Sequence, residues 1–178
     1  REGGDIAFTY ANTIMENRVC PIAEEMNSKL IMECDVTNED HIQSVFEAYQ
    51  KNYGKIDFLI HAVAFANKDD LNGDFSSITK EGWDTALNTS AYSLIALARH
   101  AKPLMNDKSA ITALTYLGGE RYVPNYNIMA IAKSALDSCV RYLAAEFGEH
   151  GIRVNSLSAG PVKTLAFKGI AGSDILLK

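Results

Sequence analysis

Short runs of apolar, β-branched residues alternate along this chain with longer stretches in which apolar residues recur every three or four positions. The short runs are typical of buried strands, and the longer periodicity is typical of helices that pack on one face. Parallel strands need a crossover between them, usually a helix, so this alternation favours a parallel sheet with helices on both faces. We therefore predict an α/β fold in three layers, built on a doubly wound parallel sheet.

The predicted elements follow from these patterns. Strands are expected at 5–10, 29–34, 56–63, 109–116 and 152–157, and helices at 39–53, 80–105 and 125–148. Asn38 and Thr79 stand at N-cap positions, and Gly54 follows the first of these helices as a C-terminal signal. A chain of 178 residues with 47% hydrophobic residues can bury one sizeable core, so we expect a single domain over 1–178.

Composition narrows the possible partners. A net charge of −5 argues against nucleic acid or an anionic membrane surface as the main partner. No apolar run approaches the ~20 residues of a membrane span, so we expect no membrane insertion. The three cysteines are widely spaced, with no CxxC motif and no Cys/His cluster. This pattern predicts reduced thiols in a cytoplasmic protein without a metal site.

Two tyrosines and a lysine lie close together and carry the clearest chemical signal. Tyr116 ends a predicted strand, Tyr126 opens the helix that follows, and Lys133 comes two turns later. Seven residues at 3.6 per turn place Tyr126 and Lys133 about 20° apart around the helix axis, so both side chains face the same way. A phenol beside an ammonium group forms a polar pair that can donate protons.

The spacing of these residues resembles the short-chain dehydrogenase/reductase superfamily, and within it the enoyl-acyl-carrier-protein reductases of bacterial fatty-acid synthesis. Typical superfamily members place a catalytic tyrosine four residues before the lysine, and a serine 13 residues before that tyrosine. Here those positions hold Met129 and Tyr116, and the tyrosine has moved to Tyr126. Seven residues after Trp83, where typical members have Asn, stands Ser90. The enoyl reductases have this rearrangement, and the similarity covers essentially the whole chain.

The resemblance implies the reaction and the catalytic residues. Hydride from NADH would reduce the trans-2 double bond of an enoyl thioester carried by acyl-carrier protein. Tyr126 would hydrogen-bond the enolate oxygen, Lys133 would hold the nicotinamide ribose, and Tyr116 would line the acyl site. Ala66 and Ala166 are further substrate-binding candidates. A donor aimed at developing charge typically contributes ~10²–10³ in rate.

The resemblance also implies a cofactor site and an assembly. The cofactor-binding candidates are Ala11, Asp35, Val36, Ala62, Val63, Ala64, Lys133, Val162 and Thr164. Asp35 would accept from the adenine amino group, although an Asp that caps the next turn would look the same in sequence. Neither an acidic nor a basic residue follows the first strand at 10–12. Without an Arg or Lys to hold a 2′-phosphate, this segment favours NADH over NADPH. The family is tetrameric, so we expect a homotetramer packed through the helices at 80–105 and 125–148.

In a Rossmann-type fold the Gly-rich phosphate-binding turn comes one strand before 5–10, and the sequence does not contain it. We therefore expect the domain to lack its first strand–helix unit and a C-terminal part.

Two other functions fit the sequence. A carbonyl reductase with an unusual use of Tyr126 or Tyr116 is the first alternative to an enoyl reductase. The second is a non-catalytic nucleotide-binding or interaction module.

Overall fold

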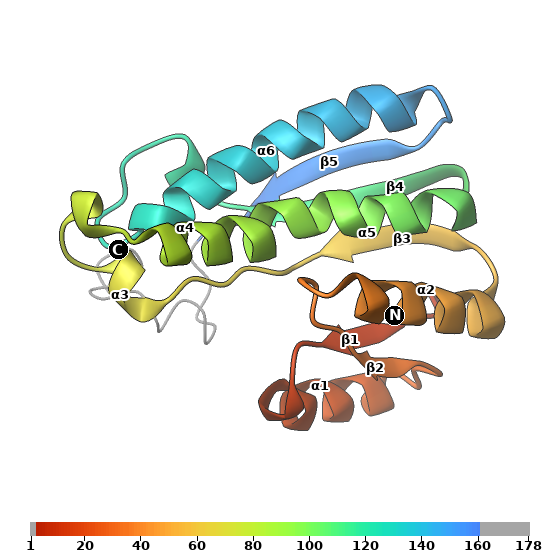
Figure 1. The fold of residues 1–178 in the computed structure, drawn as a ribbon. Coiled ribbons are helices and arrows are strands. Elements are labelled where there is room, and N and C mark those ends of the chain that lie inside the picture. Colours follow the sequence, from red (N-terminus) through yellow and green to blue (C-terminus); the bar gives the residue numbers. More distant parts are fainter. Residues whose placement is uncertain (1–2, 161–178) are drawn as a thin grey trace.

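The strands of the computed structural model, which describes residues 3–160, are all parallel to their neighbours (Figure 1). β1 (Phe8–Tyr10) pairs with β2 (Ile31–Glu33). β3 (Ile56–His61), β4 (Met105–Thr115) and β5 (Arg153–Ser158) form a second sheet in that order. The predicted parallel α/β architecture is therefore confirmed. Within the described residues β1 and β3 share no ladder, so the sheet is divided into two parts.

Helices cover both faces of these sheets. They are α1 (Thr13–Glu25), α2 (Glu39–Tyr53), α3 (Lys68–Leu71), α4 (Lys80–Leu87), α5 (Ser93–Ala101) and α6 (Asn127–Gly148), with a π-helical turn η2 (Asn88–Tyr92) between α4 and α5. Short 3₁₀ turns lie at η1 (Phe75–Ser77), η3 (Lys102–Leu104) and η4 (Leu117–Gly119). α2 packs against α5, and α5 packs against α6. In Figure 1, α1 lies on the opposite side of the β1–β2 pair from α2.

One large core lies between the helices and the sheets. Its fully buried side chains come from α2, α5, β4 and α6, among them Ile42, Leu94, Ile111, Leu136 and Phe147. A second, smaller apolar cluster gathers at the start of α6. Burying large aliphatic and aromatic side chains stabilises a fold by ~1.5–3 kcal/mol each, so these contacts fix the helices on the sheet.

Local signals in the sequence explain several helix ends. The Asn38 side chain accepts from the Asp40 and His41 amides, and the Thr79 hydroxyl accepts from the Gly82 amide, so both predicted N-caps are confirmed. Gly54 ends α2 at φ 82°, a conformation that glycine adopts without strain.

The predicted helices differ from the structure in two places. α1 was not predicted, because Pro21 lies inside it and its apolar residues form only a weak stripe. The helix expected at 80–105 is interrupted by η2, and Met105 belongs to β4 instead. A continuous apolar pattern does not distinguish a regular helix from one with a π turn, because the turn adds a single residue.

None of the described helices is both long and apolar enough to cross a membrane.

Candidate active site

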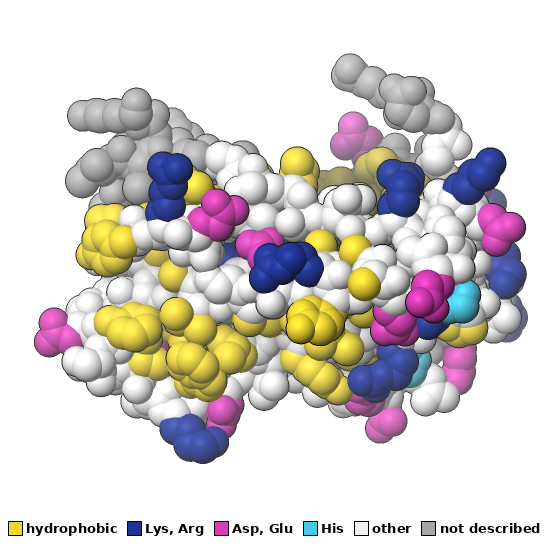
Figure 2. Space-filling view, turned by 90° about the horizontal axis from the view of Figure 1, so that it is seen from above, with side chains coloured by type: hydrophobic (Ala, Val, Ile, Leu, Met, Phe, Trp, Pro, Cys, Tyr) yellow, Lys and Arg dark blue, Asp and Glu magenta, His cyan; other side chains and the backbone are white. Residues whose placement is uncertain are grey.

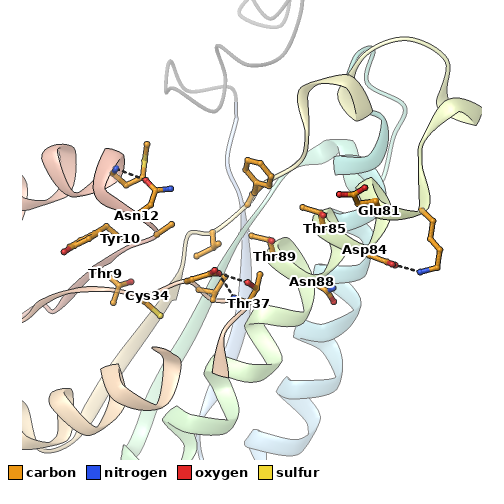
Figure 3. Close-up of a pocket in the computed structure, with 18 residues that line it drawn as sticks. Thr9, Tyr10, Asn12, Cys34, Thr37, Glu81, Asp84, Thr85, Asn88 and Thr89 are labelled. Atoms are coloured by element: carbon orange, nitrogen blue, oxygen red, sulfur yellow. Dashed lines mark hydrogen bonds and ion pairs between the residues drawn. The ribbon is translucent and has the colours of Figure 1, made fainter. Parts of the chain in front are cut away.

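A cavity of about 1080 Å³ opens at the carboxyl ends of β1, β2 and β3 (Figure 3). This is the position at which ligands bind in open α/β sheets. Thr9, Tyr10 and Asn12 line it from β1 and the start of α1, and Glu81, Asp84 and Thr85 line it from α4 on the opposite side. Five of the cofactor-binding candidates also line it, and they are Ala11, Asp35, Val36, Val63 and Ala64.

Asp35 presents an ionised carboxylate to this cavity. Its Oδ1 accepts from the Thr37 amide at 2.9 Å and from the Thr37 hydroxyl at 2.7 Å. These hydrogen bonds, helped by nearby His41, hold the pKa of the Asp35 carboxyl below its ordinary value. Asp35 therefore does cap the following turn, and it also offers a charged acceptor beside the apolar Val36 side chain.

The segment after β3 brings small residues to the cavity. Val63 and Ala64 line the cavity, whereas Ala62 does not lie among its lining residues. The Ser90 hydroxyl accepts from the Phe65 amide at 3.0 Å and donates to the Phe65 carbonyl at 3.1 Å. The fully buried Ser90 in η2 therefore fixes the backbone of this segment.

Tyr116 and Tyr126 meet edge to face. Their ring centroids lie 5.1 Å apart with an interplanar angle of 69°. Tyr126, immediately before α6, is 6% exposed, and Tyr116 follows the last residue of β4. Burial raises the pKa of the Tyr126 phenol, and the neighbouring Tyr116 raises it further. The phenol is therefore held protonated, as a hydrogen-bond donor must be.

Lys133 is buried in α6, although an isolated helical lysine is usually exposed. Its Nζ donates to the Leu114 carbonyl of β4 at 2.6 Å. Burial lowers the pKa of the Lys133 amine, while Asp137 one turn later raises it. The Asp137 carboxylate is held in turn by the Thr115 hydroxyl at 3.0 Å. An ammonium group with further donor capacity thus lies at the carboxyl end of β4.

His61 and Ser93 were not predicted as site residues. Ser93 Oγ donates to the Thr89 carbonyl at 2.6 Å, so the neighbouring His61 Nε2, 2.8 Å away, is assigned as the donor to Ser93. Burial and then the nearby Lys133 lower the pKa of His61 to about 4. The last residue of β3 is therefore a buried, neutral imidazole. A lone histidine at the end of a predicted strand does not indicate from sequence that its side chain is buried and neutral.

Some of the predicted substrate- and cofactor-binding residues lie within residues 3–160, and others lie outside this range. Ala66 packs on the cluster that contains Tyr126 and Met129, and Tyr116 packs on the same cluster. Val162, Thr164 and Ala166 lie outside the described residues. Among residues 3–160, no group of three or more His, Cys, Asp or Glu side chains could hold a metal ion.

Comparisons with known proteins agree with this geometry. The family model of the enoyl-(acyl carrier protein) reductases matches residues 1–178. The enoyl-acyl-carrier-protein reductase (NADH) of Rickettsia felis is 43% identical over 178 residues, which are 100% of this chain and 68% of that protein. The corresponding protein of Enterococcus faecalis is 46% identical over 99% of this chain and 70% of its own length.

Solved structures give the same result. The enoyl-acyl-carrier-protein reductase (NADH) of Aquifex aeolicus superposes with a TM-score of 0.95 at 44% identity, covering 99% of this chain and 69% of the other. The reductase of Bacillus cereus, solved with NADP+ and indole naphthyridinone, gives 0.94 at 44% identity, covering 98% and 69%. With a family model matching its whole length and relatives this similar, the chain belongs to the enoyl-(acyl carrier protein) reductase family.

Proposed function

We propose that the protein reduces the trans-2 double bond of enoyl-acyl-carrier-protein thioesters with hydride from NADH, in fatty-acid synthesis. The observation that carries this proposal is the buried, protonated Tyr126 against Tyr116, with Met129 at the position of the usual catalytic tyrosine. A carbonyl reductase must protonate an oxygen at the carbon that receives hydride. An enoyl reductase stabilises charge on the thioester oxygen, which lies further from that carbon.

The roles of the residues follow from this chemistry. When bound, NADH supplies the hydride to the β-carbon of the enoyl thioester. Tyr126 donates a hydrogen bond to the thioester oxygen as negative charge develops there. Lys133 holds the ribose hydroxyls of the cofactor with the ammonium donors that Leu114 does not use. Tyr116 packs against the Tyr126 ring and orients it beside the acyl group.

The cavity also fits a dinucleotide without a 2′-phosphate. Asp35 would bind the adenine amino group, and Val36 would pack on the ring. Lys80, the one lysine among the lining residues, is paired with Asp84 at 2.5 Å. The side-chain oxygen of Asn12 is used as the N-cap of α1. A 2′-phosphate would therefore find no unpaired cationic side chain among the described lining residues, which favours NADH over NADPH.

The test is reduction of a crotonyl thioester by the full-length protein, with NADH and with NADPH. We expect NADH to be preferred, and Tyr126→Phe to lose about 10²–10³ in kcat because the oxyanion loses its donor. Tyr122→Phe is the matched control, since this tyrosine of the same segment is 87% exposed. Wild-type activity in Tyr126→Phe would remove Tyr126 from the mechanism, and preference for a ketone would favour the carbonyl-reductase alternative.

We also propose that four copies of the chain assemble through α4, α5 and α6. Trp83, Tyr92 and Tyr142 of these helices and of η2 leave large aromatic surfaces exposed. Figure 2, viewed from the side on which α6 lies in Figure 1, shows groups of hydrophobic side chains between charged ones. Light scattering on the full-length protein should give the mass of a tetramer, and a monomer would contradict this proposal.

The three cysteines are all free thiols, which supports a reducing, cytoplasmic environment as a further part of the proposal.

A further inference from the structure

A buried aspartate precedes Leu71, which packs on the apolar cluster that contains Tyr126. Asp70, in the short helix α3, is 7% exposed. Its Oδ2 accepts from the Asn67 side chain at 3.1 Å. Within residues 3–160, no lysine, arginine or histidine forms an ion pair with it. Burying a carboxylate is costly unless other groups stabilise its charge, so the position of Asp70 needs a physical explanation.

The explanation lies at the first turn of α4. A Cβ added to Gly82 would lie 2.5 Å from Asp70 Oδ1 and closer still to the other carboxyl atoms. The Asp70 carboxylate therefore occupies the space that a side chain at position 82 would need. Gly82 is the third residue of α4, at the end of the helix that carries partial positive charge. That end of the helix stabilises the buried carboxylate, and only glycine lets it approach so closely.

The contact determines the position of a longer segment. Leu71, next to Asp70, packs on the cluster that contains Tyr126 and Met129, and Ala66 packs there too. The Gly73 carbonyl accepts from the Asn127 side chain at 3.1 Å, which ties the same segment to the start of α6. The segment 66–73 is thus held between α4 and α6, against the cluster that contains the proposed donor Tyr126.

We propose that Asp70 is a positioning residue: its contact with Gly82 places the segment 66–73 against Tyr126 and so shapes the acyl side of the active site. This inference rests on the proposed function. The Asp70 contact holds the segment that carries Ala66, whereas the adenine-binding candidates Asp35 and Val36 line the cavity from the end of β2. A change in the contact should therefore alter thioester binding more than NADH binding.

A double-mutant cycle in the full-length protein tests this. Gly82→Ala forces the added methyl group into the carboxylate and displaces the segment. We expect KM for a crotonyl thioester to rise about tenfold, because small displacements near reacting groups are costly. We expect KM for NADH to change by less than about twofold. Gly148→Ala in α6, where an added Cβ meets nothing within 4 Å, is the matched control.

Asp70→Ala also raises KM for the thioester, because the segment loses its contact with α4. In the Asp70→Ala background the space beside Gly82 is free, so adding Gly82→Ala should cause no further rise. This loss of additivity is the signature of the direct contact, and thermal unfolding should show the same coupling. Additive effects of the two substitutions on KM in an active enzyme would overturn the inference alone. A wild-type protein without crotonyl reductase activity would overturn the proposed function and this inference with it.

Discussion

Gly118 lies against both rings of the tyrosine pair. An added Cβ would lie 2.5 Å from Tyr126 Cδ1 and 3.1 Å from Tyr116 Cδ1. Real Cβ atoms do not approach ring carbons this closely, so the two rings and this glycine are packed as one unit. Glycine is needed here for the space that it leaves open, since the φ of Gly118 does not lie in the left-handed region.

Gly118→Ala should therefore displace Tyr126. We expect kcat/KM for the crotonyl thioester to fall by about 10²-fold, which is the cost of a donor moved by roughly 1 Å. NADH binding, followed by fluorescence titration, should change little. Gly148→Ala serves as the control here also, and equal activities of the two variants would contradict the packing argument.

The sequence predicted where Tyr116, Tyr126 and Lys133 lie better than it predicted the residues around them. Tyr116, Tyr126 and Lys133 have a spacing that specifies a strand end and one helix face. His61, Ser93 and Asp70 were missed because their burial depends on contacts with segments distant in sequence. Nothing in the neighbouring residues distinguishes a buried histidine from an exposed one.

At the scale of elements, the π turn η2 fixes the segment that follows β3. It places Ser90, which is fully buried, opposite the backbone of Phe65. The sequence predicts one regular helix over 80–105, because Thr79 caps it and its apolar residues continue through the turn. Sequence patterns describe which faces are apolar, and they do not register one extra residue in a turn.

Ser90→Ala removes the hydroxyl that accepts from the Phe65 amide and donates to the Phe65 carbonyl. We expect the free energy of unfolding to fall by about 1–3 kcal/mol, because buried backbone groups are left without partners. Ser44→Ala is the control, since the exposed Ser44 hydroxyl bonds only the Asp40 carbonyl of its own helix. Chemical denaturation of both variants measures the difference, and equal losses would contradict a structural role for Ser90.

At the scale of the whole molecule, the buried neutral His61 makes folding depend on pH. Burial and Lys133 lower its pKa to about 4 from an ordinary 6.5. Between these values the unfolded chain binds a proton that the folded chain does not. Stability is therefore complete above the ordinary pKa and is lost as the pH falls toward the folded value.

The free energy of unfolding should fall between pH 6.5 and about pH 4, by up to about 1.4 kcal/mol per pH unit from this residue. Urea denaturation across this range measures the slope. His61→Gln, which keeps a donor for Ser93 and cannot titrate, should flatten the slope. The exposed His150→Gln variant should retain it, and a slope unaffected by His61→Gln would contradict this assignment.

The π turn has one more consequence, which concerns the direction of the helix faces on either side of it. α4 turns Glu81, Asp84 and Thr85 toward the cavity, whereas α5 turns Leu94 and Ala98 into the core. If η2 became α-helical with no change of sequence, its extra residue would rotate α4 by about 100° and shift it by about 1.5 Å relative to α5. Leu94 and Ala98 would stay in the core, and Glu81, Asp84 and Thr85 would turn away from the cavity. The extra residue in η2 therefore lets α5 face the core while α4 faces the cavity.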